Sequence, residues 1–283
     1  MGSAARWSVP RPPTSPRRIG SIGAVGEYVR LEVDDGVGVI RLDRPPANAI
    51  DLQLGLELQE AIREAAETDD VGALVVWGGP KIFAAGADIK AMAEWGPDEV
   101  KPSVDALGEA CDLLEATPKI SIAAVNRYAL GGGMELALAA DLRLLGDDAR
   151  LGQPEIGIGV IPGAGGTQRL TQLIGPGRAL ELVVTGRQIE AAEALSLGLT
   201  HRVEPADEVF DAAVRDARVF ANGPRKALGA AKAAIRAAVQ TPGSAGIATE
   251  RALFLQLFGS PDQREGMRAF LDKRDPRFGA PAS

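Results

Sequence analysis

The chain has 283 residues, of which 46% are hydrophobic and 24% charged, the balance of a globular protein. Its formal net charge of −7 argues against a nucleic-acid partner, because phosphate contacts need a basic surface. No apolar run approaches the ~18–20 residues that cross a bilayer, so we expect no membrane partner.

Cysteine and histidine are nearly absent. Cys111 is the only cysteine, which excludes an intramolecular disulfide and a cysteine-based metal site and fits a cytoplasmic location. His201, the only histidine, lies in a predicted short strand with no nucleophile motif nearby, and we expect a structural or surface role for it. Any catalysis is therefore expected to use carboxylates and backbone dipoles, without a metal.

The first 25 residues are rich in Arg, Pro, Ser and Gly and contain no acidic residue. They lack the apolar core of a secretory signal. Their prolines would break the amphipathic helix of a mitochondrial transit peptide. We therefore predict a disordered tail over residues 1–25, with a transit peptide as the alternative.

Residues 26–204 are predicted to form an α/β core. Alternating segments at 28–33 and 37–42 predict paired strands joined by a turn. Residues 51–68 have an apolar stripe at helical spacing, and residues 71–77 read as a buried strand. The alternation of helices and strands continues with a helix at 97–116, a strand at 120–125, a short helix after Gly131 and a strand at 141–145.

Residues 205–283 are predicted to form a helical C-terminal region. No further strand pattern follows there, and Gly or Pro separates the helical segments. These segments are 206–222, 224–239, 245–258 and 261–274.

Three stretches, at 83–92, 124–141 and 151–170, are too glycine-rich and too apolar to be ordinary connections, and they are the candidates for a functional site. Their glycines alone could serve tight turns or close packing. None matches a nucleotide motif: the segment from Gly163 lacks the last glycine of GxGxxG, and GxxxxGK[ST] is absent. Dinucleotide and triphosphate binding are therefore disfavoured.

Two glutamates lie within these apolar stretches. Glu135 stands between Met134 and Leu136, and Glu155 precedes Ile156. A carboxylate in such surroundings is costly unless it is paired, hydrogen-bonded or protonated. One such glutamate would suggest a cap or core ion pair, whereas two favour a site at which carboxyls exchange protons with a ligand.

With these motifs the chain resembles the crotonase superfamily, and most of all enoyl-CoA hydratase, from about residue 28 to residue 278. The resemblance includes residues 44–49, the three glycine-rich stretches and residues 265–274. It implies an α/β, crotonase-type spiral of ββα units with a helical C-terminal oligomerisation region, and a homo-trimer or hexamer.

The resemblance also implies how the motifs act. Glu135 and Glu155 match the two catalytic glutamates: Glu135 draws a proton from the attacking water, and Glu155 supplies the proton to C2 of the substrate. Ala87 and Gly132 match an oxyanion hole whose N–H groups stabilise the enolate oxygen. No cofactor is implied, because coenzyme A is part of the substrate.

Nine residues match coenzyme A or substrate contacts of the family: Lys81, Ala85, Ala87, Asp88, Ile89, Lys90, Gly163, Phe270 and Lys273. Asp88 is expected to cap the helix that begins there rather than to touch substrate. Lys90 is either a phosphate contact or a solvated helix residue. Either Phe270 packs on its own subunit and Lys273 is solvated, or both serve the site of a neighbouring subunit.

The implied function is the reversible hydration of trans-2-enoyl-CoA to 3-hydroxyacyl-CoA in fatty-acid or related acyl-CoA metabolism. An isomerase that moves a double bond from position 3 to position 2 is the alternative within the superfamily. Because the isomerase needs no held water and only one glutamate, the presence of Glu135 and Glu155 favours the hydratase. A non-enzymatic acyl-CoA binder or RNA binder is a third, less favoured reading.

Overall fold

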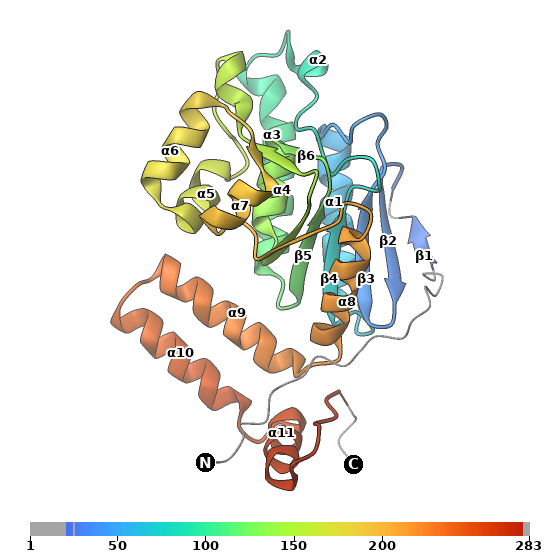
Figure 1. The fold of residues 1–283 in the computed structure, drawn as a ribbon, viewed down its shortest axis with the longest axis vertical. Helices are drawn as coiled ribbons and strands as arrows, with labels where there is room; N and C mark the ends of the chain where they lie inside the picture. The colour runs from blue at the N-terminus through green and yellow to red at the C-terminus, as the bar shows by residue number, and fades with distance from the viewer. Residues whose placement is uncertain (1–20, 25, 280–283) are drawn as a thin grey trace.

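The computed structural model describes residues 21–24 and 26–279 (Figure 1). Its strands are β1 (Ser21–Ala24), β2 (Val29–Asp34), β3 (Val37–Leu42), β4 (Ala73–Trp77), β5 (Ile120–Val125), β6 (Tyr128–Leu130), β7 (Leu142–Gly146), β8 (Arg150–Gly152), β9 (Ile189–Glu190) and β10 (Arg202–Glu204). Its first helices are α1 (Leu52–Glu67), α2 (Ile89–Met92), α3 (Pro97–Ala116), α4 (Gly132–Ala139) and the 3₁₀ helix η1 (Pro154–Ile158). These are followed by α5 (Gly166–Ile174), α6 (Pro176–Thr185), α7 (Ala191–Leu197), α8 (Val209–Ala221), α9 (Arg225–Gln240), α10 (Ser244–Leu257) and α11 (Pro261–Asp272).

The main sheet has the strand order β1-β2-β3-β4-β5-β7-β10. The predicted hairpin is confirmed: β2 and β3 pair antiparallel, and Asp35 and Gly36 take the left-handed conformation that its turn requires. From β3 onward each neighbouring pair is parallel. The carboxyl ends of these strands therefore meet at one edge of the sheet, where parallel sheets place their ligand sites.

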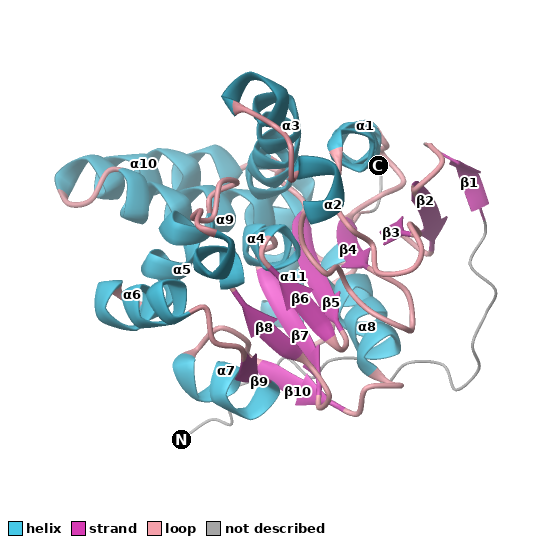
Figure 2. Cartoon of the chain, turned by 90° about the horizontal axis from the view of Figure 1, so that it is seen from above, coloured by secondary structure: helices cyan, strands magenta, loops and turns pink. Residues whose placement is uncertain are grey.

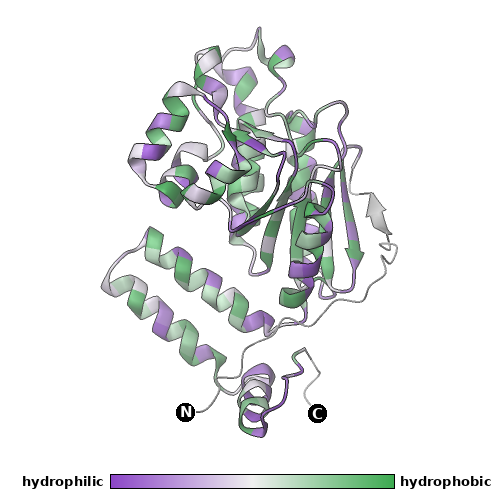
Figure 3. Cartoon of the chain, in the orientation of Figure 1, coloured by the Kyte–Doolittle hydropathy of each residue, from purple (hydrophilic) through white to green (hydrophobic). Residues whose placement is uncertain are grey.

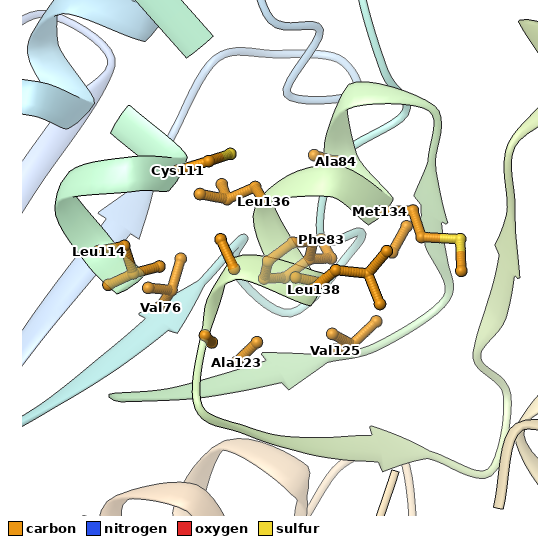
Figure 4. Packing of buried hydrophobic residues seen from close by; sticks show 14 of the residues in the cluster. Val76, Phe83, Ala84, Cys111, Leu114, Ala123, Val125, Met134, Leu136 and Leu138 are labelled. Carbon is orange, nitrogen blue, oxygen red and sulfur yellow. The ribbon is translucent and has the colours of Figure 1, made fainter. Parts of the chain in front are cut away.

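Helices cover both faces of this sheet (Figure 2). The predicted apolar stripe of α1, which includes Leu54, Leu58 and Ile62, is buried in the larger core together with residues of α3 and α4. Figure 4 shows how Phe83 packs in that core among side chains of β4, β5, α3 and α4. On the opposite face, alanines of α8 pack on valines of β3 and β4. Each large aliphatic side chain buried in this way stabilises the fold by ~1.5–3 kcal/mol.

A second, three-stranded sheet has the order β6-β8-β9 and adjoins α4. Every residue of α4 from Gly132 to Ala139 is buried, which explains why its sequence is apolar apart from Glu135. The sequence analysis predicted none of these three strands and none of the helices α5 to α7. Strands of two or three residues are too short to show a period.

The C-terminal helices extend from the α/β body, with α9 and α10 side by side (Figure 1). Lys232 on α9 is buried against the body, where its ammonium donates to Oδ2 of Asp141 at 2.8 Å and to the carbonyl of Lys119 at 3.2 Å. The apolar side chains Phe254 and Leu255 on α10 are exposed. Figure 3 shows that hydrophobic segments, in green, alternate with hydrophilic ones along the C-terminal helices. This region is therefore attached through α9 and leaves apolar surface uncovered.

The predicted disordered tail, residues 1–25, lies largely outside the described residues. Its residues 21–24 form β1, which pairs antiparallel with β2 and extends the main sheet. The sheet therefore begins before residue 26. Among the described residues, no helix is long and apolar enough to cross a membrane.

Candidate active site

Glu135 lies one turn into α4, with only 3% of its surface exposed. Its Oε1 accepts the backbone N–H of Ala164 at 2.7 Å and that of Gly166 at 2.8 Å. Both donors belong to the turn that leads into α5. A buried carboxylate is thus satisfied by backbone dipoles, as the sequence analysis required of it.

Glu155 lies on η1, close to the start of the same helix α4. Its Oε1 is 2.8 Å from the position that a Cβ on Gly131 would occupy, and Gly131 has a left-handed φ of +50°, which favours glycine there. Gln153 is fully buried beside it. The side-chain amide of Gln153 is satisfied when its nitrogen faces Glu155. In this orientation the nitrogen donates to Oε1 of Glu155 at 3.0 Å and to Oε2 at 3.2 Å. The two glutamates, 20 residues apart in sequence, thus meet at the N-terminal end of α4.

The two carboxyls have different electrostatic surroundings. Burial raises the pKa of Glu155 to about 7, and the nearby Glu135 carboxylate adds to the rise. Burial also raises the pKa of Glu135, but its two N–H donors and the Arg169 guanidinium act to lower it. A pair of acids in which the two pKa values are set by different contacts is the usual basis for assigning one as acid and one as base.

Ala87 and Gly132 present backbone N–H groups next to these carboxyls. Ala87 and Ile50 are paired in an isolated β-bridge, but the hydrogen bonds of this bridge are made by the residues on either side of Ala87. The Ile50 N–H donates to the carbonyl of Gly86 at 2.7 Å, and the Asp88 N–H donates to the carbonyl of Ile50 at 3.2 Å. Because N–H groups alternate in direction along an extended segment, that of Ala87 points away from Ile50. Gly132 begins α4, where N–H groups lack intrahelical acceptors.

The amide nitrogen of Ala87 is 3.9 Å from the position that a Cβ on Gly132 would occupy, so the two groups are neighbours. Two neighbouring positions in this region require glycine. Gly86 has φ +101°, and a Cβ on Gly133 would clash with the carbonyl oxygen of Ala84. The structure therefore brings Ala87, Gly132 and both glutamates together. Their catalytic roles remain predictions.

The residues expected to contact coenzyme A lie mostly in the loop that leads into α2 and on α2 itself. Lys81 and Ala85 in the loop, and Ile89 and Lys90 on α2, are exposed. Asp88 accepts the N–H of Ala91 at 3.3 Å and thereby caps α2, as expected. Its Oδ2 also pairs with the Arg44 guanidinium at 3.0 Å, and this hydrogen bond lowers the pKa of Asp88.

Gly163 lies on the other side of the site, against α3: a Cβ on Gly163 would be 3.2 Å from Cγ1 of Val104. Phe270 and Lys273, by contrast, lie on or just after α11, at the opposite end of the molecule from α2 (Figure 1). Phe270 is 75% exposed. The chain alone therefore does not bring these two residues to the remainder of the site.

Asn48 connects the two loops that flank this region. It accepts the N–H of Arg44 at 2.9 Å, and its amide nitrogen donates to the carbonyls of Gly78 at 2.7 Å and Phe83 at 2.9 Å. These contacts tie the loop at residues 44–48 to the segment at residues 78–83. Arg127 adopts a left-handed φ of 53°, a conformation that favours glycine.

Four groups at the site were not predicted from the sequence: the N–H groups of Ala164 and Gly166, the amide of Gln153 and the guanidinium of Arg169. Backbone donors have no sequence signal of their own. Of the unused reactive groups, Cys111 is buried, which raises its pKa to about 12, and His201 is exposed. Among residues 21–24 and 26–279, no three or more His, Cys, Asp and Glu side chains are grouped to hold a metal ion.

The chain was compared with known families and structures. The family model described as enoyl-CoA hydratase/isomerase matches residues 32–281. The probable enoyl-CoA hydratase echA8 of Mycobacterium bovis is 43% identical over 254 residues, which cover 89% of this chain and 98% of that protein. The protein of the same name in Mycobacterium leprae is 45% identical over 244 residues, covering 86% and 94%.

A solved structure of enoyl-CoA hydratase from Bacillus anthracis superposes with a TM-score of 0.85 at 36% identity, covering 89% of this chain and 99% of that one. These matches extend over the α/β core and the C-terminal helices. They confirm the crotonase-type fold that the motifs predicted. The chain therefore belongs to the enoyl-CoA hydratase/isomerase family.

Proposed function

We propose that this protein is an enoyl-CoA hydratase, which adds water reversibly to trans-2-enoyl-CoA and gives 3-hydroxyacyl-CoA. One observation carries the proposal beyond family membership. Two carboxyls with different surroundings, Glu135 and Glu155, meet beside the backbone N–H groups of Ala87 and Gly132. Hydration needs each of these parts.

Each of the four groups has its own part in the reaction. The ionised Glu135 accepts a proton from water while the water oxygen bonds to C3 of the substrate. The electron pair of the C2–C3 double bond moves toward the thioester, and the N–H groups of Ala87 and Gly132 stabilise the negative charge on its oxygen. Protonated Glu155 then transfers its proton to C2. Proton exchange afterwards restores both carboxyls. An oxyanion donor of this kind is worth ~3–4 kcal/mol of barrier.

The isomerase activity of the same family is the second candidate. It moves a proton between C4 and C2 and needs no water held between two carboxyls. The carboxyl of Glu155, with a pKa of about 7 and a fully buried amide of Gln153 beside it, favours the hydratase, because it gives the site a second group poised to exchange protons near neutral pH.

We also propose that the protein works as a homo-trimer or hexamer, in which α11 of one subunit reaches the coenzyme A site of the next. Support comes from the apolar side chains that α10 and α11 expose, including Phe254, Leu255, Phe270 and Leu271. A contiguous exposed apolar surface typically marks an interface. By family resemblance we further propose a cytoplasmic enzyme of β-oxidation or related acyl-CoA metabolism, with no cofactor besides the coenzyme A of its substrate.

The direct test is to mix the purified protein with trans-2-butenoyl-CoA and follow the loss of the enoyl absorbance, with 3-hydroxybutyryl-CoA identified by mass. A 3-enoyl-CoA is the parallel substrate. Hydration that is much faster than the shift of the double bond supports the proposal. Isomerisation without hydration would identify an isomerase, and binding without turnover of either thioester would identify a binding protein.

A further inference from the structure

Arg169 is a nearly buried arginine on α5 to which the reaction scheme gives no part. Its side chain is 10% exposed and folds back over the start of its own helix. There its guanidinium donates to the carbonyl of Ala164 at 2.8 Å. A cation at a helix N-terminus is unfavourable with respect to the helix dipole, so other contacts must hold it there.

Two carboxylates of α3 supply those contacts. The Arg169 guanidinium donates to Oδ1 of Asp112 at 2.7 Å and to Oε2 of Glu115 at 3.1 Å. Glu115 is in turn in contact with α9, since its Oε1 lies 3.4 Å from the Arg236 guanidinium. The arginine is therefore fixed at three points, on α3, on its own turn and, through Glu115, on the C-terminal helices.

The turn that Arg169 holds is the one that binds Glu135. Ala164 accepts from Arg169 through its carbonyl and donates to Glu135 through its N–H. Gly165, between the two donors, has φ +101°, and a Cβ on this residue would clash with the guanidinium. Glycine at this position thus permits both the turn and the close approach of the arginine.

We propose that Arg169 is a positioning residue for Glu135: by fixing the turn at residues 164–166 it makes two backbone N–H groups converge on one oxygen of that carboxylate. The inference rests on the proposed function, in which Glu135 is the base. It also predicts an electrostatic contribution, because the charge of Arg169 favours the ionised form of Glu135. The other titratable groups facing Glu135 are Glu155 and Cys111.

If Arg169 only linked α3 to α5 structurally, it would make the same ion pairs. The test must therefore measure a property of Glu135 itself, namely its pKa. The variants are Arg169→Met, which removes the charge and the donors, and Arg169→Lys, which keeps the charge. Arg187→Met is the matched control, because Arg187 is an exposed arginine that also pairs with two carboxylates, Glu181 and Glu193.

Two readouts are combined. The first is kcat and KM for trans-2-butenoyl-CoA across pH. The second is the pKa of Glu135 in the free protein, measured by NMR on ¹³C-labelled glutamate carboxyls and assigned with Glu135→Gln. For Arg169→Met we expect kcat to fall ~10–100-fold, KM to stay within about twofold, and the Glu135 pKa to rise by ~1 unit. Arg169→Lys should restore most of the pKa, and Arg187→Met should change neither quantity.

A folded Arg169→Met protein with wild-type kcat and an unchanged Glu135 pKa would overturn the inference, even if its melting temperature fell. Should Arg169→Met not fold, Arg169→Gln, which removes the charge but keeps a polar side chain, is judged by the same two criteria. A wild-type protein that hydrates no enoyl-CoA would contradict the proposed function instead, and the NMR titration would then still decide the role of Arg169.

Discussion

The N–H group of Gly166 donates to Oε1 of Glu135 over 2.8 Å, from the first residue of a different helix. Ala164 donates to the same oxygen. Within the described residues, both hydrogen bonds to the Glu135 carboxylate are accepted by Oε1. The carboxylate of Glu135 is thus oriented by backbone N–H groups, whereas the pKa of Glu155 is raised by burial and by the nearby Glu135 carboxylate.

The first prediction concerns the pH dependence of kcat/KM. In the proposed mechanism Glu135 reacts as the carboxylate, and its pKa lies above the ordinary value, so activity should rise with pH on the acid side. In the same mechanism Glu155 reacts in its protonated form, and its pKa is about 7, so activity should fall as pH increases through neutrality. The profile measured with trans-2-butenoyl-CoA should be a bell with its basic limb near 7. A rate that keeps rising above pH ~8 would show that protonated Glu155 is not required.

The second prediction concerns stability. The pKa of Glu155 is raised in the folded protein, so folding favours its protonated form, and the resulting stability is lost as pH rises from ~4.5 to about 7. Glu155→Gln mimics the protonated form. It should raise the free energy of unfolding at pH ~8 by ~1–2 kcal/mol, allowing for partial exposure, and have no effect at pH ~4. Urea titrations should show this difference, whereas the exposed carboxylate control Glu60→Gln should show none. A pH-independent effect would contradict the assignment.

Much of this site could be predicted from sequence because its strongest signals are local. Two glutamates in apolar, glycine-rich segments stand out wherever they occur, and the hairpin and α1 follow from residue periods. Arg169 and Gln153 could not be found in this way. Their importance comes from contacts with Ala164, Glu115 and Glu155, which the fold brings together. The short strands β6, β8 and β9 were missed because they carry too few residues to show alternation.

The third prediction separates the backbone N–H of Gly132 from the space around it. Gly132→Pro deletes the N–H at the first position of a helix, where proline is tolerated. Its kcat should fall ~10²–10³-fold. Gly132→Ala keeps the N–H, but its Cβ would approach Cδ2 of Leu107 at 2.8 Å. Combining it with Leu107→Ala should therefore restore activity, while the same change should not rescue the proline variant. Equal losses in both single variants, with both folded, would indicate crowding rather than a lost donor.

The fourth prediction tests the shared coenzyme A site. If Lys273 pairs with a phosphate of coenzyme A bound to a neighbouring subunit, Lys273→Ala should raise KM for enoyl-CoA at low ionic strength and leave kcat nearly intact. The effect should shrink as salt screens the pair. An enoyl-pantetheine thioester, which lacks the nucleotide, should not respond, and neither should the exposed-lysine control Lys226→Ala with the full substrate. A protein that light scattering shows to be an active monomer would rule out the arrangement.

The most direct test of the central claim, that two carboxyls share the chemistry, is single-turnover hydration of trans-2-butenoyl-CoA by Glu135→Gln and by Glu155→Gln. Each variant should stay folded, bind the thioester with near wild-type affinity, and hydrate it at least ~10³-fold more slowly, a loss of ~4 kcal/mol of transition-state stabilisation. If a variant kept more than about a tenth of the wild-type rate, the barrier would have risen by less than ~1.4 kcal/mol. That result would show that the substituted glutamate is not required for hydration.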